Sequence, residues 1–377
     1  MTNSDIFVTT LVWLRMLAKV PNKIFQKWFV LPILAIVTFG LTEIGARNPD
    51  FTEKVYSRSI YPVLAYIISN LSNPFPFSLD DMFYLLLIIS VITLVVLLIT
   101  KRISWKYLAR LVLNVLAMVY VLFYFLWGFN YYREDLNTRL QLKEQMPDTD
   151  DFLKQLENLI DDTNKSYSSF ENMEKEIIDS LVEDSYKKLA KALAIKYPAG
   201  KRKDKSITWS SFFAKAGISG YFGPFFNEIH VNKKVLPIEY PSVLAHEKAH
   251  QFGITSEAEA NFYAWIVCTQ SSSKQLQYSA NLHILRYFLH QGYQLEEYPE
   301  IISKLDVRVK DDYQRIRENW MNLRNEKVDR VASKVNDSYL KSNKVDKGIK
   351  DYTGVVKHVM NFSLDSAFQK RHNLPVK

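Results

Sequence analysis

The chain has 377 residues, and Lys and Arg outnumber Asp and Glu by 48 to 40, which gives a formal net charge of +8. This excess is modest, so nucleic-acid binding would need a concentrated basic face, and we expect no nucleic-acid partner. The single cysteine, Cys268, excludes an intramolecular disulfide and a cysteine-based zinc site. The hydrophobic fraction of 48% is clustered, which indicates a membrane protein with the lipid bilayer as a partner.

The N-terminal region contains the first predicted membrane span, over residues 28–46. Its uncharged run lies between Lys27 and Glu43 and is long enough to cross a bilayer when it is extended through Ala46. A cleaved signal peptide is the weaker alternative, because no small-residue cleavage site follows at the usual position. Residues 6–18 are apolar enough to form an interfacial helix.

Two further spans are predicted over residues 82–100 and 111–132, because neither run contains a charged residue. Trp127, Tyr131 and Tyr132 would form an aromatic belt at one end of the third span. Residues 1–132 are therefore predicted to be the membrane domain.

Basic residues predict the orientation of the spans. Four of them precede the first span and four fill the loop between the second and third: Arg15, Lys19, Lys23, Lys27, Lys101, Arg102, Lys106 and Arg110. Because positive charge stays in the cytoplasm, residues 45–81 and everything after Tyr132 should lie outside. We expect a multi-pass protein of the cell (inner) membrane with an extracytoplasmic C-terminal domain.

Residues 133–377 alternate between helical and strand-like patterns. Asp150–Lys165 and Phe170–Tyr197 have helical periodicity, whereas Ile207–Asn232 is rich in aromatic and β-branched residues and predicts short strands, the last over about Phe225–Val231. From Ser242 onward the chain is predicted to be helical. The fold class is therefore mainly α, with three transmembrane helices followed by an α+β domain that contains a small sheet.

Two segments have open interpretations. The loop at 45–81 is mixed in charge but contains an apolar stretch at 59–78 with Pro62, Pro74 and Pro76, so it would either lie on the membrane surface or cap the soluble domain. Residues 331–377 contain nine Lys or Arg and four Asp, which favours a solvated helical surface over contact with anionic headgroups.

The stretch HEKAH, residues 246–250, predicts a metal site. We expect Pro241 and Ser242 to start a helix with Ser242 as its N-cap. His246 and His250 would then leave the same helix face one turn apart, where both can bind one Zn²⁺. Glu247, offset by about 100°, can accept a proton from a zinc-activated water and is the predicted catalytic base.

The third ligand is expected on the next helix. Gly253 should end the first helix in a positive-φ conformation. Glu257, in the first turn of the following helix, can point back toward the histidines, and Asn261 shares its face as a residue that orients a ligand. Glu259 should face away and is the alternative ligand.

The pattern HExxH followed by Glu257-Ala258-Glu259-Ala260-Asn261 resembles the Glu-ligand zincins, including membrane prenyl-protein proteases, heat-shock membrane proteases and phage-immunity metallopeptidases. More closely, the chain resembles a bacterial family of unknown function with three spans and a zincin-like domain. The shared pieces are VYSRSIYP at 55–62, PFSLDD at 76–81, WGFNYYR at 127–133, HEKAHQFG, EAEANF and DSYLKSN at 337–343. The resemblance implies a zincin fold with zinc on His246, His250 and Glu257, but no substrate.

The expected function is that of a membrane-anchored zinc metalloendopeptidase acting on a protein or peptide substrate. The alternative is a zincin-like scaffold or sensor without turnover. A substrate strand would lie along Phe225–Asn232 as an edge strand. A second oxyanion donor is usual in such sites, and its candidates are His230, Tyr221, Tyr278 and His283.

Overall fold

The computed structural model describes residues 28–197 and 202–374, so the predicted interfacial helix at 6–18 lies outside the described residues. The chain divides into two compact units: residues up to Glu43 with Leu87–Tyr124, and Ile44–Leu86 with Phe125–Lys377. Residues 44–86 therefore belong to the same unit as the C-terminal region, whereas the sequence analysis grouped them with the membrane domain.

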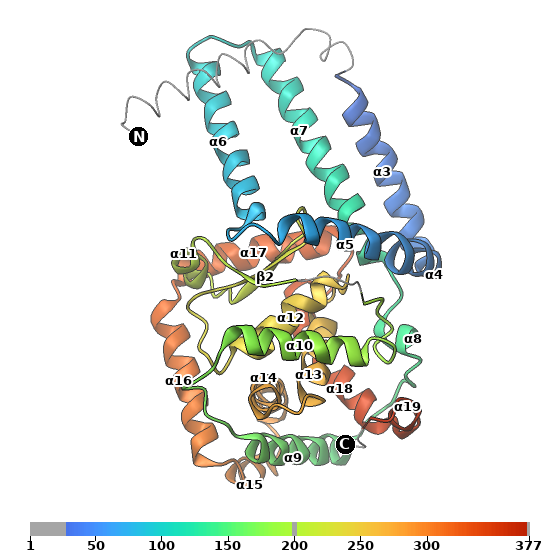
Figure 1. Cartoon of the computed structure of the whole chain (residues 1–377), viewed down its shortest axis with the longest axis vertical. Helices are drawn as coiled ribbons and strands as arrows, with labels where there is room; N and C mark the ends of the chain where they lie inside the picture. The colour runs from blue at the N-terminus through green and yellow to red at the C-terminus, as the bar shows by residue number, and fades with distance from the viewer. Residues whose placement is uncertain (1–27, 198–201, 375–377) are drawn as a thin grey trace. The chain divides into compact units, whose positions relative to one another are not determined.

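Three helices are long and apolar enough to span a membrane: α3 (Val30–Arg47), α6 (Leu79–Ile99) and α7 (Trp105–Leu126) (Figure 1). They correspond to the three predicted spans, and α6 is the most apolar, with a mean hydropathy of 3.1. The third helix starts before the predicted residue 111 and ends at Leu126 rather than 132. The absence of charge thus marked the segment but not its helical limits.

The predicted aromatic belt after the third span is wrong. Residues Gly128–Tyr132 form a short 3₁₀ helix, η2, in the second unit. Trp127 and Tyr132 are buried there, and the Trp127 indole nitrogen donates a hydrogen bond to the backbone oxygen of His250 at 3.0 Å. Trp127 thus packs into the domain, where its indole N–H finds a backbone acceptor.

The second unit is mainly helical. Before its sheet it contains α4 (Pro49–Phe51), the π-helix η1 (Thr52–Ile60), α5 (Tyr61–Ser72), α8 (Leu136–Leu140), α9 (Thr149–Ser166) and α10 (Lys175–Leu189). Among and after the strands follow α11 (Ser210–Lys215), α12 (Tyr240–Gln251), α13 (Glu257–Thr269), α14 (Lys274–Gly292), α15 (Tyr298–Ser303), α16 (Val307–Leu323), α17 (Glu326–Ser342), the 3₁₀ helix η3 (Gly348–Gly354), α18 (Val355–Leu364) and α19 (Ser366–Arg371). The predicted helix at 150–165 matches α9, whereas the one predicted over 170–197 is shorter, as α10.

The sheet has three short strands in the order β1 (Lys205–Ser206), β3 (Glu228–Val231), β2 (Gly220–Gly223). β3 pairs in parallel with β1 and antiparallel with β2, where Tyr221 lies opposite His230. The prediction that Phe225–Asn232 is an edge strand is therefore wrong, because β3 is the central strand. The outer strand β2 takes that position, and α11 forms where further strands were expected.

The core of the second unit surrounds α12 and α13. Both helices are buried on nearly every face and pack against each other, against α10 and against α14, and α12 also contacts β2 and β3. Within this unit, α5 and α17 lie along one edge, and α9 and α15 lie along the opposite edge (Figure 1). The segment HEKAH is therefore the centre of the domain and not a solvated surface helix.

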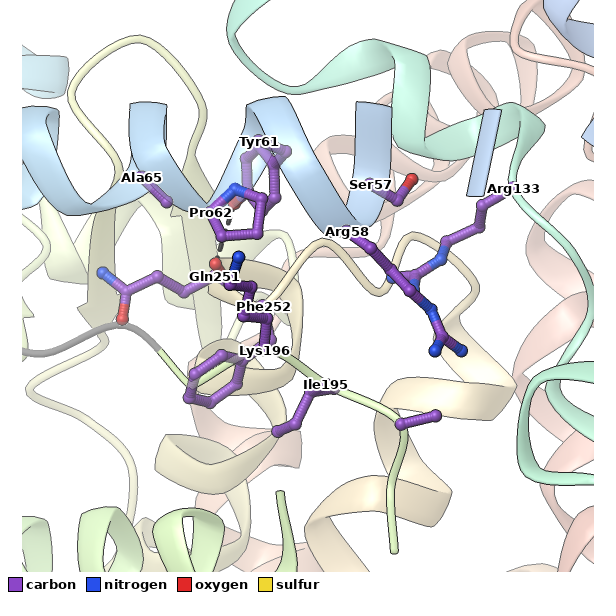
Figure 2. Close-up of a pocket in the computed structure, with 11 residues that line it drawn as sticks. Ser57, Arg58, Tyr61, Pro62, Ala65, Arg133, Ile195, Lys196, Gln251 and Phe252 are labelled. Carbon is purple, nitrogen blue, oxygen red and sulfur yellow. Dashed lines mark hydrogen bonds between the residues drawn. The ribbon is translucent and has the colours of Figure 1, made fainter. Parts of the chain in front are cut away.

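Residues 44–86 pack on this domain, which confirms the expected cap. Figure 2 shows Tyr61 and Pro62 of α5 facing Gln251 and Phe252 at the end of α12, in a pocket that Arg58 and Arg133 also line. The Tyr61 hydroxyl donates to the backbone oxygen of Gln251 at 2.7 Å. The helix that carries HEKAH is thus held at its C-terminal end by the loop between the first two spans.

Candidate metal centre

The helix α12 brings the two histidines together. It starts at Tyr240 after Glu239, with Pro241 in its first turn, so the predicted N-cap, Ser242, lies inside the helix. Pro241 favours this earlier start because its missing N–H is not needed in a first turn. The one-turn spacing of His246 and His250 places their Nε2 atoms 3.1 Å apart.

The turn after α12 returns the chain toward the histidines. Gly253 has φ +80°, as predicted, and a Cβ there would also lie 2.9 Å from Oδ1 of Asn130. Ser256 caps α13, and Glu257 is its first residue. Oε2 of Glu257 lies 3.0 Å from Nε2 of His246 and 3.5 Å from Nε2 of His250, so the structure brings the three predicted ligands to a common point.

Each histidine is oriented through its other ring nitrogen. Nδ1 of His250 donates to the backbone oxygen of Ile254 at 2.7 Å, and Nδ1 of His246 lies 2.9 Å from Oδ1 of Asn261, as predicted for that residue. With protons on both Nδ1 atoms, both Nε2 atoms present lone pairs to the shared point. His283 also contacts Oδ1 of Asn261, through Nε2 at 3.1 Å. This candidate oxyanion donor therefore lies on the Nδ1 side of His246, away from the point that the Nε2 atoms share.

Charge is concentrated at this point. Burial opposes ionisation of Glu257, but the positive charge and hydrogen bonds of His250 and His246 outweigh it and hold the pKa of that carboxyl well below its usual range. Burial lowers the pKa of His250, but Glu257 and Glu247 raise it to about 9. Positive charge at the cluster is thus strongly favoured.

Glu247 lies against the outer strand. Its side chain is buried, and Oε2 has no hydrogen-bond partner among the described residues. Burial, ahead of the opposing effect of both histidines, raises the pKa of Glu247. A Cβ on Gly220 would lie 2.6 Å from Oε1 of Glu247, so β2 approaches this carboxylate closely only because residue 220 is glycine.

Glu259 faces away from the histidines, as predicted. Its carboxylate forms an ion pair with the buried Arg139 and accepts a hydrogen bond from the backbone N–H of Leu136 at 3.1 Å. These contacts join α13 to α8, so Glu257 is the carboxylate of this turn that faces the histidines. The alternative assignment of Glu259 as a ligand is therefore wrong.

Tyr352 lies close to the candidate site, although no sequence motif indicates it. Its side chain lies close to Glu257, and burial, followed by the charge of Glu257, raises the pKa of Tyr352 well above the usual value. The neighbouring Asp351 accepts a hydrogen bond from the Ser256 hydroxyl at 2.7 Å, which fixes η3 beside the start of α13. No spacing rule links Tyr352, which is 95 positions after Glu257, to the HExxH motif, so only the fold reveals this proximity.

The other three candidate oxyanion donors are engaged elsewhere. His230 is fully buried, stacks on Tyr221 and has Nε2 2.7 Å from the Ser78 hydroxyl. Tyr221 donates to Asp81. Tyr278 donates to Asp312 at 2.8 Å, so none of the three has its polar side-chain atom free for the site.

A buried ion cluster supports α12 from behind. Lys248, the first variable residue of HExxH, is fully buried and contacts Asp179 at 2.8 Å and Glu183 at 2.5 Å. Arg202 also contacts Glu183, at 2.6 Å. Lys248 thus faces α10 while its neighbours Glu247 and His250 face the site, which fixes the rotation of the helix.

Comparison with known protein families matches residues 56–360 to a family described as protein of unknown function, DUF3810, and the chain belongs to this family. No curated protein and no solved structure matches it. The expected membership of a family of unknown function is confirmed, whereas the zincin-like fold and its chemistry stay predictions.

Proposed function

We propose that this member of the DUF3810 family is a membrane-anchored, zinc-dependent endopeptidase with a zincin-like domain. The observation that carries the proposal is the mutual approach of three ligand atoms, Nε2 of His246, Nε2 of His250 and Oε2 of Glu257, at 3.0–3.5 Å. An ion that holds such atoms at about 2.0–2.1 Å in tetrahedral geometry would separate them by roughly 3.3 Å. The residues therefore fit zinc in size and in ligand type.

The orientation of the donors supports the same assignment. With both Nδ1 atoms donating hydrogen bonds, three electron-rich atoms converge, and they repel one another unless a cation or additional protons lie between them. Two imidazoles and one carboxylate are the protein ligands of many catalytic zinc sites, which leave a fourth position for water or substrate. Bound zinc would lower the pKa of a water ligand and polarise a carbonyl group.

Glu247 is the proposed general base. Its buried carboxylate has a raised pKa, which suits a group that accepts a proton from water and then donates it to the leaving amine. Because Gly220 leaves space beside Oε1, a substrate strand added to the outer edge of β2 would run past this carboxylate. β2 therefore takes the substrate-binding role first assigned to Phe225–Asn232.

Tyr352 is the proposed second donor to the developing oxyanion. Its side chain lies close to Glu257, and the neighbouring Asp351 fixes η3 beside the start of α13 through Ser256. The raised pKa keeps the phenol protonated at neutral pH, so that it can donate a hydrogen bond. This assignment replaces the four candidates taken from the sequence.

The proposed location is the cell membrane, with the second unit outside. The support is the set of basic residues that precedes α3 and fills the loop between α6 and α7. Alkaline phosphatase fused after Lys377 should be active in intact cells. A cytoplasmic reporter that is active at the same fusion point would reverse the orientation.

Glu247→Gln separates an enzyme from a scaffold without turnover. The variant should keep one zinc per chain and lose hydrolysis of a quenched-fluorescent peptide library, because the amide cannot act as the base. Glu171→Gln, at an exposed position on the same unit, is the matched control and should retain both properties. Zinc binding without hydrolysis in the wild-type protein would favour the scaffold, and equal hydrolysis by Glu247→Gln would reject the assigned base.

A further inference from the structure

The segment that joins the first two spans has both ends at the membrane. Only Asn48 separates α3 from α4, and only residues 73–78 separate α5 from α6. The continuous helical segment Pro49–Ser72 is about 36 Å long, whereas six extended residues reach at most about 20 Å. With α3 and α6 both crossing a bilayer, the far end of the segment would lie within about 20 Å of the membrane, which excludes an upright segment.

The two faces of α5 fit this position. One face packs into the second unit through residues that include Tyr61 and Ala65. The opposite face exposes Val63, Ile67 and Leu71, which are four residues apart and 53%, 48% and 68% accessible. A helix that is apolar on both the protein side and the outer side is suited to lie between protein and lipid.

A second exposed apolar stripe lies on α17, along the same edge of the unit as α5 (Figure 1). Val331, Val335 and Tyr339 share one face at a spacing of four, and both valines are more than 60% accessible. The adjacent face carries Arg330 and Lys334, both exposed. An apolar stripe beside a basic one matches the surface of a bilayer with anionic headgroups.

Residues near the ends of the spans contact α17, the helix α12 and the turn between β2 and β3. The hydroxyl of Tyr339 lies 3.2 Å from that of Tyr131, five residues after α7 ends. Trp127, the first residue after α7, bonds to the backbone of His250. Phe225, in the turn between β2 and β3, packs on Phe83 near the start of α6, with ring centroids 4.7 Å apart. The ligand helix and the outer strand are thus both tied to residues where spans begin or end.

We propose that the exposed faces of α5 and α17 seat the domain on the bilayer surface, so that its site acts on polypeptide segments at the membrane surface, such as the juxtamembrane regions of membrane proteins. The seating follows from the helices alone, and the substrate class rests on the proposed function. Sequences far from the membrane would reach the outer strand β2 less often than segments held at the interface.

Seating is tested with variants of the full chain that each add one exposed cysteine labelled with an NBD fluorophore, in vesicles of phosphatidylcholine and phosphatidylglycerol. Val63→Cys and Val335→Cys should show blue-shifted emission and be quenched by doxyl-labelled lipids. Val307→Cys, equally exposed but at the start of α16, is the control and should show neither effect. The unsubstituted chain is the labelling blank, because Cys268 is buried. Emission at 63 and 335 that matches the control would overturn the proposal, as would a blue shift without lipid quenching, which would indicate a protein occupant.

The substrate class is tested with membrane-anchored reporters that carry one cleavable sequence at increasing distances from their span. Wild-type protein should cleave the reporter with the shortest spacer at least tenfold faster than a soluble copy of the same sequence. Equal cleavage at all distances would overturn the substrate class while leaving the peptidase intact. No cleavage of any reporter would instead count against the proposed function, and the fluorescence result would stand by itself.

Discussion

The close approach of β2 to Glu247, the proposed general base, makes Gly220→Ala the most informative substitution. The new Cβ would lie 2.6 Å from Oε1 and 2.9 Å from Cγ of Glu247, and 2.8 Å from the backbone oxygen of His230. Ordinary van der Waals contact begins at 3.4 Å, so Oε1 has to move by about 0.8 Å. A displacement of about 1 Å at a reacting group can cost roughly 100-fold in rate. We therefore expect kcat to fall by about 10- to 100-fold.

The zinc content should not change, because none of the three ligands touches the new methyl group. The assay compares kcat and bound zinc per chain for Gly220→Ala and for Gly40→Ala, a matched control whose Cβ would meet nothing within 4 Å. Unchanged kcat in Gly220→Ala would refute the role of Glu247 as a positioned base. Loss of zinc together with activity would show that β2 supports the metal site rather than the base.

Three further predictions concern the proposed ligands, the proposed oxyanion donor and the ion cluster of Lys248, Glu183 and Arg202. Glu257→Gln should lose stoichiometric zinc, as measured by metal analysis. Glu259→Gln should keep zinc but lower the free energy of unfolding by about 3 kcal/mol in denaturant, because the buried Arg139 loses its charged partner. Zinc loss in Glu259→Gln and zinc retention in Glu257→Gln would show that the ligands were misassigned. Tyr352→Phe should lower kcat by about 100-fold with zinc retained, and a fall in zinc affinity alone would show that the phenol only supports the ligand. Burial raises the pKa of Glu183, but Lys248 and Arg202 outweigh it and bring it to about 2, below its unfolded value. The stabilisation, roughly 3 kcal/mol, is thus present above pH 4.5 and lost as the pH falls toward 2, and Glu183→Gln should unfold with a weaker dependence on pH in that range.

The sequence predicted the local geometry of the site well because that geometry depends on helix periodicity. A spacing of four brings His246 and His250 to one face, and a spacing of two separates Glu257 from Glu259. The positive φ of Gly253 was predictable for the same local reason. The start of α12 was missed because Pro241 permits a helix to begin one residue before it.

Features that depend on contacts between residues far apart in the sequence could not be predicted. The uncharged run through Tyr132 reads as membrane-spanning, yet Trp127 is buried in the domain, where its indole finds a backbone acceptor. Similarly, β3 appeared to be an edge strand because the two-residue strand β1 carries little sequence signal. Tyr352 lies beside Glu257 only because the C-terminal helices return to α13.

X-ray absorption at the zinc edge of the detergent-solubilised wild-type protein tests the central claim most directly. The proposed site predicts one zinc per chain, bound by two imidazole nitrogens and a carboxylate oxygen at about 2.0–2.2 Å. Failure to bind stoichiometric zinc, or a first coordination shell without two imidazoles, would contradict it.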